Sequence, residues 1–392
     1  MTFVAELQDL IDRTYFHTWR KFEHVKTNAR LFGLKKKTVD AWRTPGEPAF
    51  VADLATYPFA RRQLAQLIER HLSPKISSGK PLVSGVFVHQ KPKVRFGSPS
   101  TEIELGDMLF VRHHFRSKAK SPEGRAFLLQ AKSTAQPATG ALSGKEEKQF
   151  DLYANWDTPL TFPYGDIGPP PGTSKKWNLS KGPKPHVDSG FYGLVSNDGE
   201  FVANKFPDDS AWAVGPAFAP KASGAKAVAA TGSLAYAMHS FLIGSHGRPW
   251  TLGASTDDHW SNFVEEVLER SLDWKTKVQR LQLNELPRQA SALSFVDAFA
   301  TANAVEDVTH AAYVRPDDIG IGDLDRIWES ETASIREQRK AWLDSGGELN
   351  LRGSKVTPPA GEPNRARDPG GMSVLYVATF GEGSLEEPRP QR

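Results

Sequence analysis

Three polar side chains lie near the ends of two neighbouring β-strand candidates. Asp107 lies within Thr101–Phe115, and Gln130 and Lys132 close Arg125–Lys132. The turn between the two runs predicts a hairpin, which would bring these side chains together. Because side chains alternate along a strand, Gln130 and Lys132 share one face of it.

These residue types suit a cation site. A carboxylate oxygen of Asp107, the side-chain carbonyl of Gln130 and the backbone carbonyl of Ala131 can together hold a hard divalent cation. The adjacent Lys132 can orient a water molecule or neutralise an oxyanion. The pattern therefore predicts hydrolytic chemistry that depends on Mg²⁺ or Mn²⁺.

The arrangement resembles the PD-(D/E)XK nuclease superfamily, whose signature is an Asp on one strand and an acid-x-Lys on the next. Gln130-Ala131-Lys132 is similar in particular to Mrr-type restriction endonucleases, where Gln replaces the usual acid. Gln149 and Tyr153 make a QxxxY spacing in the next helix candidate, which resembles the third motif of RecB-like and Cas4-like nucleases. At i and i+4 both side chains lie on one helical face.

The resemblance covers about residues 51–200 and implies a metal-dependent nuclease that hydrolyses phosphodiester bonds, with DNA favoured. Asp107 and Gln130 would be ligands of Mg²⁺ or Mn²⁺, together with the carbonyl of Ala131. Lys132 would position the attacking hydroxide or stabilise the pentacovalent transition state. The bound cation would polarise the phosphate and lower the pKa of a bound water.

The resemblance also implies roles outside the metal site. Gln149 and Tyr153 would hold the nucleic-acid strand beside the cation. The Mrr likeness implies a restriction or antiviral defence setting. Because a free-standing nuclease could harm its host, we expect control by a regulatory protein partner or by a homo-oligomer.

Gln130 leaves the site one negative charge short of the superfamily pattern, so a further carboxylate is expected. One candidate is Glu69, in the helix before the strands. The other is Glu104, three residues before Asp107. Strict alternation places Glu104 on the opposite face of the strand, and only a bulge at Gly106 would bring it round.

The elements that must position these residues predict an α/β fold. Hydrophobic periodicity and β-rich runs alternate with turn residues. The order resembles the restriction-endonuclease-like αβββαβ core, a mixed sheet flanked by helices. The predicted elements are a helix at 59–72, strands at 82–89, 101–115 and 125–132, a helix at 145–156 and a strand at 189–196.

Composition predicts four segments along the 392 residues. The nuclease-like core carries a Pro- and Gly-rich insertion at 157–188, which we expect at the surface. Helices are expected at 231–243, 257–273, 288–312 and 322–344, and one further strand at 372–380. The segments are a basic helical one at 1–50, the core at 51–200, a mostly helical region at 201–356, and a linker with that strand and a tail at 357–392.

Charge and missing motifs narrow the function classes. Residues 1–150 carry a net charge of +11 and the remainder −8, which predicts a polyanion-facing side. Lys35, Lys36 and Lys37 are candidate phosphate contacts. The chain has no Cys, and we find no phosphate loop, HExxH, GxSxG or dinucleotide fingerprint. No signal peptide or membrane span is evident, so we expect a soluble, cytoplasmic protein without membrane contact.

Two alternatives remain open. The first is a catalytically inactive nuclease-fold module that binds nucleic acid or a protein partner, which Gln130 favours. The second is a helical interaction protein whose β region is only structural. His113 and His114 place one imidazole on each face of a strand, and we expect core or surface positions for them rather than a metal site.

Overall fold

All the residues that the computed structural model describes fall within Met1–Asn303 and Asp368–Arg392, one of the two units into which the chain divides. Lys35, Lys36 and Lys37 and the helices predicted at 288–312 and 322–344 lie outside the described residues. The described residues are 1–31, 44–73, 76, 81–86, 92–95, 102–116, 123–135, 137–140, 147–154, 160–162, 175–179, 188–198, 210–215, 228, 232–273, 372–381 and 384–385.

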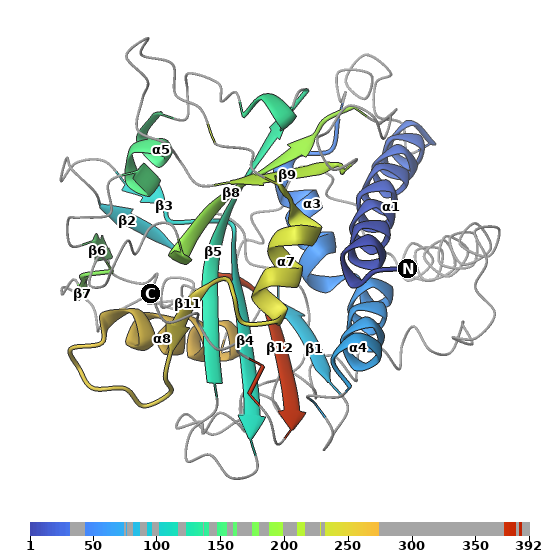
Figure 1. Ribbon diagram of the computed structural model, residues 1–392. Helices are drawn as coiled ribbons and strands as arrows, with labels where there is room; N and C mark the ends of the chain where they lie inside the picture. Colours follow the sequence, from blue (N-terminus) through green and yellow to red (C-terminus); the bar gives the residue numbers. More distant parts are fainter. Residues whose placement is uncertain are drawn as a thin grey trace, which may run out of the picture. The chain divides into compact units, whose positions relative to one another are not determined.

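A mixed sheet runs through the centre of this unit (Figure 1). Its strand order is β1-β12-β4-β5-β8-β9-β10, and β11 pairs with β5. β4 and β5 form an antiparallel pair, whereas β8 is parallel to β5 and β12 is parallel to β4. The strands are β1 (Leu82–Val86), β4 (Met108–Arg116), β5 (Glu123–Thr134), β8 (Gly190–Ser196), β9 (Trp212–Gly215), β10 (Gly232–Ser233), β11 (Arg248–Trp250) and β12 (Ser373–Gly381).

A second, smaller sheet has the order β3-β2-β6-β7. Two of its strands come from the stretch 157–188, which the sequence places at the surface. That prediction is wrong for Leu160, Phe162 and Trp177, whose side chains are buried. Their apolar surface is removed from water against α8 and its neighbours, which stabilises the fold. The strands are β2 (Lys93–Arg95), β3 (Glu102–Glu104), β6 (Leu160–Phe162) and β7 (Lys175–Trp177).

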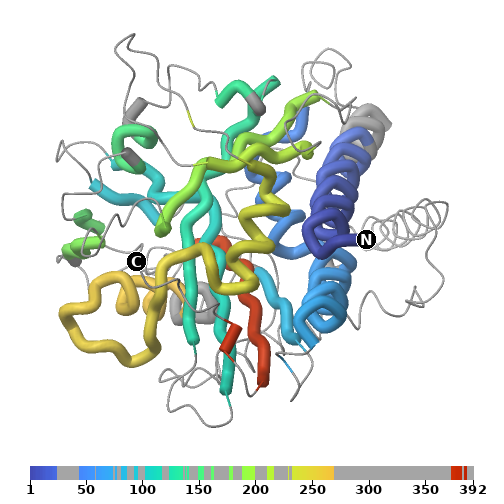
Figure 2. Tube along the Cα trace, in the orientation of Figure 1, coloured from blue at the N-terminus to red at the C-terminus, as the bar shows by residue number. Residues whose placement is uncertain are grey.

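Helices cover both faces of the main sheet (Figures 1 and 2). Four of them, α1, α3, α4 and α7, lie on one face, and α5 and α8 lie on the other with the small sheet. The molecule is therefore α/β with a mixed sheet flanked by helices. The helices are α1 (Phe3–Leu31), α3 (Glu47–Thr56), α4 (Pro58–Leu72), the 3₁₀ turn η1 (Pro137–Thr139), α5 (Glu147–Ala154), α7 (Leu234–Leu242) and α8 (His259–Asp273).

Side-chain alternation along β4 and β5 divides the core into two layers. Leu109, Val111 and Leu128 pack toward α8 and the small sheet. Phe110 and Phe127 pack toward α7 on the other face, where both rings meet Phe241. Both faces of the strand pair are therefore buried, so its polar residues must find partners inside the protein.

Most elements predicted from the sequence are present with small shifts of their ends. The helix expected at 59–72 is α4, the helix at 257–273 is α8, and the strand at 189–196 is β8. The hairpin between the second and third strand candidates is β4–β5, as predicted. None of the described helices is long and apolar enough to cross a membrane.

One prediction about strands was wrong. The run Thr101–Phe115 is not one strand, because it leaves the small sheet after β3 and enters the main sheet as β4. The strand expected at 372–380 is present as β12. β12 lies between β1 and β4 and pairs with β4 from Ser373↔Met108 to Gly381↔Arg116. Hydrophobic pattern predicts a strand but not its neighbours, because pairing depends on the whole sheet.

Candidate active site

Asp107 lies at the break between β3 and β4, and three hydrogen bonds hold that break. The amide of Leu105 donates to Pro92 O (2.9 Å), and the amide of Asp107 donates to Leu129 O (2.9 Å). The hydroxyl of Tyr153, on α5, donates to Leu105 O at 2.8 Å. A Cβ at Gly106 would lie 2.7 Å from that hydroxyl, so only glycine fits at this point without displacing a neighbour.

The Asp107 carboxylate is held against the end of β5. The Gln130 side-chain amide donates to Asp107 Oδ2, and the backbone amide of Ala131 donates to the same oxygen at 2.7 Å. Asp107 is 9% exposed and Gln130 is fully buried. The structure thus brings together the two residues that the hairpin pattern predicted to meet.

The pKa of Asp107 is raised to about 8, mainly by burial and next by the nearby Glu104 carboxylate. Lys132 and the Ala131 amide act in the opposite direction because both favour the charged carboxylate. Glu47 adds a smaller raising effect. Several charged groups therefore act on one buried carboxyl, an arrangement that is common at functional sites.

Lys132 meets an acidic residue that the sequence analysis missed. Its Nζ lies 3.4 Å from Glu47 Oε2, and the Ser133 amide donates to Glu47 Oε1 at 3.3 Å. Glu47 is in the first turn of α3, a helix that is not among the elements predicted from the sequence. Pro is favoured in the first turn of a helix, and this signal could have revealed the helix.

The predicted QxxxY pair is in place on α5, and its described contacts are with the protein itself. Gln149 Nε2 donates to Gln130 Oε1 at 3.1 Å and lies 3.4 Å from Glu104 O. Tyr153 is 2% exposed, and burial raises the pKa of its hydroxyl. These contacts position the break before β4, while the predicted hold on a nucleic-acid strand stays a prediction.

Of the two carboxylates proposed to compensate for Gln130, one lies near Asp107. Glu104 acts on the Asp107 pKa, and it approaches because β3 ends there rather than through a bulge in a continuous strand. Glu69 is exposed on α4 and is not among the charges that act on Asp107. Glu104 and Glu47 are therefore the acidic neighbours of the site.

The oxygen atoms around Asp107 suit a hard cation held by few protein ligands. Gln130 Nε2 lies against Asp107 Oδ2 and 3.3 Å from Ala131 O, so a carboxylate oxygen and a carbonyl oxygen both lie beside the end of the Gln130 side chain. In the described part of the chain, no three His, Asp or Glu side chains gather as a metal site. Mg²⁺ accepts such a set because it keeps several waters and needs few carboxylates.

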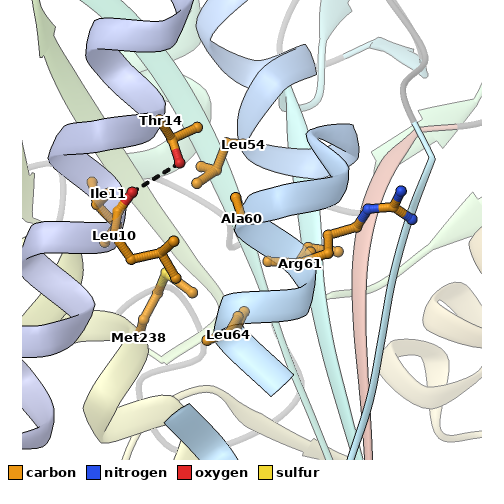
Figure 3. Close-up of a pocket in the computed structure, with 9 residues that line it drawn as sticks. Leu10, Ile11, Thr14, Leu54, Ala60, Arg61, Leu64 and Met238 are labelled. Atoms are coloured by element: carbon orange, nitrogen blue, oxygen red, sulfur yellow. Dashed lines mark hydrogen bonds between the residues drawn. The ribbon is translucent and has the colours of Figure 1, made fainter. Parts of the chain in front are cut away.

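An apolar cavity lies elsewhere in the molecule, among α1, α3, α4 and α7 (Figure 3). Its lining includes Leu10, Leu64 and Met238, and the Thr14 hydroxyl there donates to Leu10 O at 2.9 Å. The Arg61 guanidinium extends away from the other lining side chains (Figure 3). None of the residues around Asp107 lines this cavity, so it is a gap in helix packing and not part of the site.

No protein-family model matches the chain, and neither the curated proteins nor the solved structures contain a match. The likeness to PD-(D/E)XK nucleases therefore depends on the residues of this chain and on their arrangement.

Proposed function

We propose that the protein is a metal-dependent nuclease that hydrolyses phosphodiester bonds at the Asp107 site. The observation that carries the proposal is the meeting of Asp107, Gln130 and Lys132 at adjacent ends of β4 and β5, with Gln149 in contact from α5. The likeness of Gln130-Ala131-Lys132 to Mrr-type enzymes favours DNA as the substrate.

The order of the elements supports the same reading. The antiparallel β4–β5 pair is followed by α5, and β8 then returns parallel to β5. A hairpin followed by a helix and by a strand parallel to the second hairpin strand is also expected in a restriction-endonuclease-like core. The main departure is β12, a late strand beside β4.

The proposed reaction attaches a water oxygen to phosphorus, breaks the bond to the leaving sugar oxygen and transfers a proton to that oxygen. A divalent cation held by Asp107, the Gln130 side chain and Ala131 O would polarise the phosphate and acidify water. Lys132 would orient the attacking water and stabilise the charge that develops on the phosphate oxygens. Glu47 holds the Lys132 ammonium group at this point through their ion pair.

The test is cleavage of plasmid DNA and of a single-stranded oligonucleotide with Mg²⁺ or Mn²⁺. We expect the wild type to cut, and Asp107→Ala and Lys132→Ala to be inactive. Asp9→Ala and Lys176→Ala are matched controls, since both residues are exposed and lie on α1 and on β7, the strand of the small sheet farthest from β3. Wild-type protein that cuts neither substrate with either metal would contradict the proposal.

A second candidate function is binding without cleavage. The observation in its favour is that the Gln130 amide already satisfies Asp107 Oδ2 from within the protein. Retained DNA binding in a wild type that cuts nothing would support this candidate. Cleavage that Lys132→Ala abolishes while DNA binding persists would exclude it.

A further inference from the structure

Two glutamine amides form a chain of hydrogen bonds from α5 to Asp107. Gln149 Nε2 donates to Gln130 Oε1 at 3.1 Å, and Gln130 Nε2 donates to Asp107 Oδ2. The nitrogen end of the Gln130 amide therefore faces the carboxylate, and its oxygen end faces α5. A cation ligand needs the reverse orientation, because only the amide oxygen can bind a metal ion.

Rotating the Gln130 amide by half a turn exchanges its two ends within nearly the same volume. The oxygen would then take the place of the nitrogen beside Asp107 Oδ2 and Ala131 O, and the three oxygens could bind one cation. The Gln130 NH₂ group would face Gln149 and would need an acceptor there. Since Gln130 is fully buried, a missing acceptor would cost about 1–3 kcal/mol.

Gln149 can form a hydrogen bond with the Gln130 amide in either orientation of that amide. A glutamine side chain carries one donor group and one acceptor, so it can donate to the Gln130 oxygen or accept from the Gln130 nitrogen. Tyr153, on the same helical face, bonds to Leu105 O and holds α5 against the strand break. Gln149 is thereby kept within reach of Gln130.

We propose that Gln149 is a positioning residue that sets which end of the Gln130 amide faces Asp107, and that both amides reverse when a divalent cation binds. The inference rests on the proposed function, because it takes the ion at Asp107 as given. It gives Gln149 a role in cation affinity that is separate from any contact with nucleic acid.

The test is the affinity of the full-length protein for Mn²⁺, measured by isothermal titration calorimetry without nucleic acid. Gln149→Glu can only accept hydrogen bonds and favours the metal-binding orientation of Gln130. Gln149→Lys can only donate and favours the orientation with nitrogen toward Asp107. We expect Gln149→Lys to bind Mn²⁺ more weakly than Gln149→Glu. The difference in affinity should be larger than the charge difference between Lys and Glu alone would produce.

The charge effect is measured in a Gln130→Glu background, because a carboxylate has two equivalent oxygens and no end to orient. We expect the ratio of the two Mn²⁺ affinities to be at least about tenfold larger with Gln130 than with Glu at this position, which corresponds to one unsatisfied buried group. Equal ratios in the two backgrounds would overturn the proposal. Gln149 is only partly buried, so both substitutions should be tolerated, and thermal unfolding checks this.

Asp107→Asn separates this inference from the proposed function. If Asp107→Asn removes Mn²⁺ binding but the ratio of the Gln149→Glu and Gln149→Lys affinities is the same in both backgrounds, the proposed role of Gln149 is wrong and the metal site at Asp107 is supported. Mn²⁺ binding that Asp107→Asn leaves unchanged, or no binding by the wild type, overturns the metal site and the role of Gln149 with it.

Discussion

The β4–β5 pair buries polar side chains at both of its ends. At one end, Asp107 lies among Glu104, Glu47 and Lys132, and burial raises its pKa to about 8. Toward the other end, the His113 ring is bonded to the Tyr376 hydroxyl at 2.6 Å and is buried, and burial lowers the pKa of His113 to about 3.

The difference lies in where the partners come from. The partner of His113 is a hydroxyl of β12, and His114 likewise meets Thr379 Oγ1 of β12 at 2.9 Å. Sheet neighbours thus hold a neutral imidazole in the core, which agrees with the expected core position. Asp107 instead has charged neighbours from α3 and from the end of β3. Accumulated charge at a buried position indicates function more than stability.

Among substitutions outside the proposed catalytic residues, the largest effect on activity is expected from Gly106→Ala at the Asp107 end. The new Cβ would lie 2.7 Å from the Tyr153 hydroxyl, so the break must shift and carry Asp107 with it. A displacement of ~1 Å can cost about 100-fold in rate, so we expect a loss of that order. Cleavage rates together with thermal unfolding would measure it.

Tyr153→Phe sharpens this prediction, because it removes the oxygen that the new Cβ would meet. The double variant should lose less activity than the product of the two single losses. Multiplicative losses, or wild-type activity in Gly106→Ala, would contradict this account of the break.

His113→Ala, at the other end of the β4–β5 pair, should lower the stability of the protein with little loss of cleavage activity. It removes a buried ring, the bond to Tyr376 and the contact with the Trp250 ring at a centroid distance of 4.1 Å. We expect the free energy of unfolding to fall by about 2–4 kcal/mol. Denaturant titration gives that value, and cleavage is measured on the folded protein.

Asp107→Asn is the matched variant at the Asp107 end of the β4–β5 pair. It should abolish cleavage without lowering the free energy of unfolding, because it removes a charge that burial disfavours. If both variants lose stability and activity together, the contrast between the two ends is wrong.

The pH dependence of stability should reflect His113. Its pKa is about 3 in the folded protein and 6.5 in the unfolded chain, so between these values the unfolded chain binds more protons. Asp107, whose pKa is raised to about 8, contributes in the opposite direction. The contribution of His113 to stability rises with pH in this window and falls as the pH drops below 6.5. The linkage relation predicts a loss of roughly 2 kcal/mol between about pH 7 and pH 5.

His113→Gln removes this titration, so its free energy of unfolding relative to that of the wild type should rise by roughly 2 kcal/mol from pH 7 to pH 5. Denaturant titrations of both proteins at the two pH values would measure the difference. The same pH dependence in wild type and variant would rule out His113 as its source.

The smallest effect on stability is expected for Glu47→Gln. Its ion pair with Lys132 is 3.4 Å long, and the Glu47 side chain is 27% exposed, so the pair contributes less than about 1 kcal/mol. Cleavage should fall by a larger factor, roughly tenfold, because Lys132 loses its anchor. Kinetics and denaturant titration separate the two quantities, and unchanged cleavage would mean that Lys132 is positioned by other groups.

The sequence predicted the members of the site better than their surroundings. Asp107 and Gln130 follow from a local hairpin, and Gln149 follows from helical spacing, so short-range patterns suffice for both. Glu47 was missed because it lies 85 residues from Lys132 in the chain. The predicted bulge at Gly106 was wrong because a chain that changes sheets leaves no local signal that distinguishes it from one long strand.

The sequence by itself determined several of the helices and strands, among them α4, α5, β5 and β8, because hydrophobic period and turn residues act over a few positions. It also determined that Asp107 would face Gln130. Only the tertiary structure decided that β12 enters the sheet beside β4 and that Glu47 meets Lys132. Tertiary packing likewise placed the Tyr153 hydroxyl on the break before Asp107. Contacts between distant segments depend on how all the layers pack together, which no single stretch of sequence encodes.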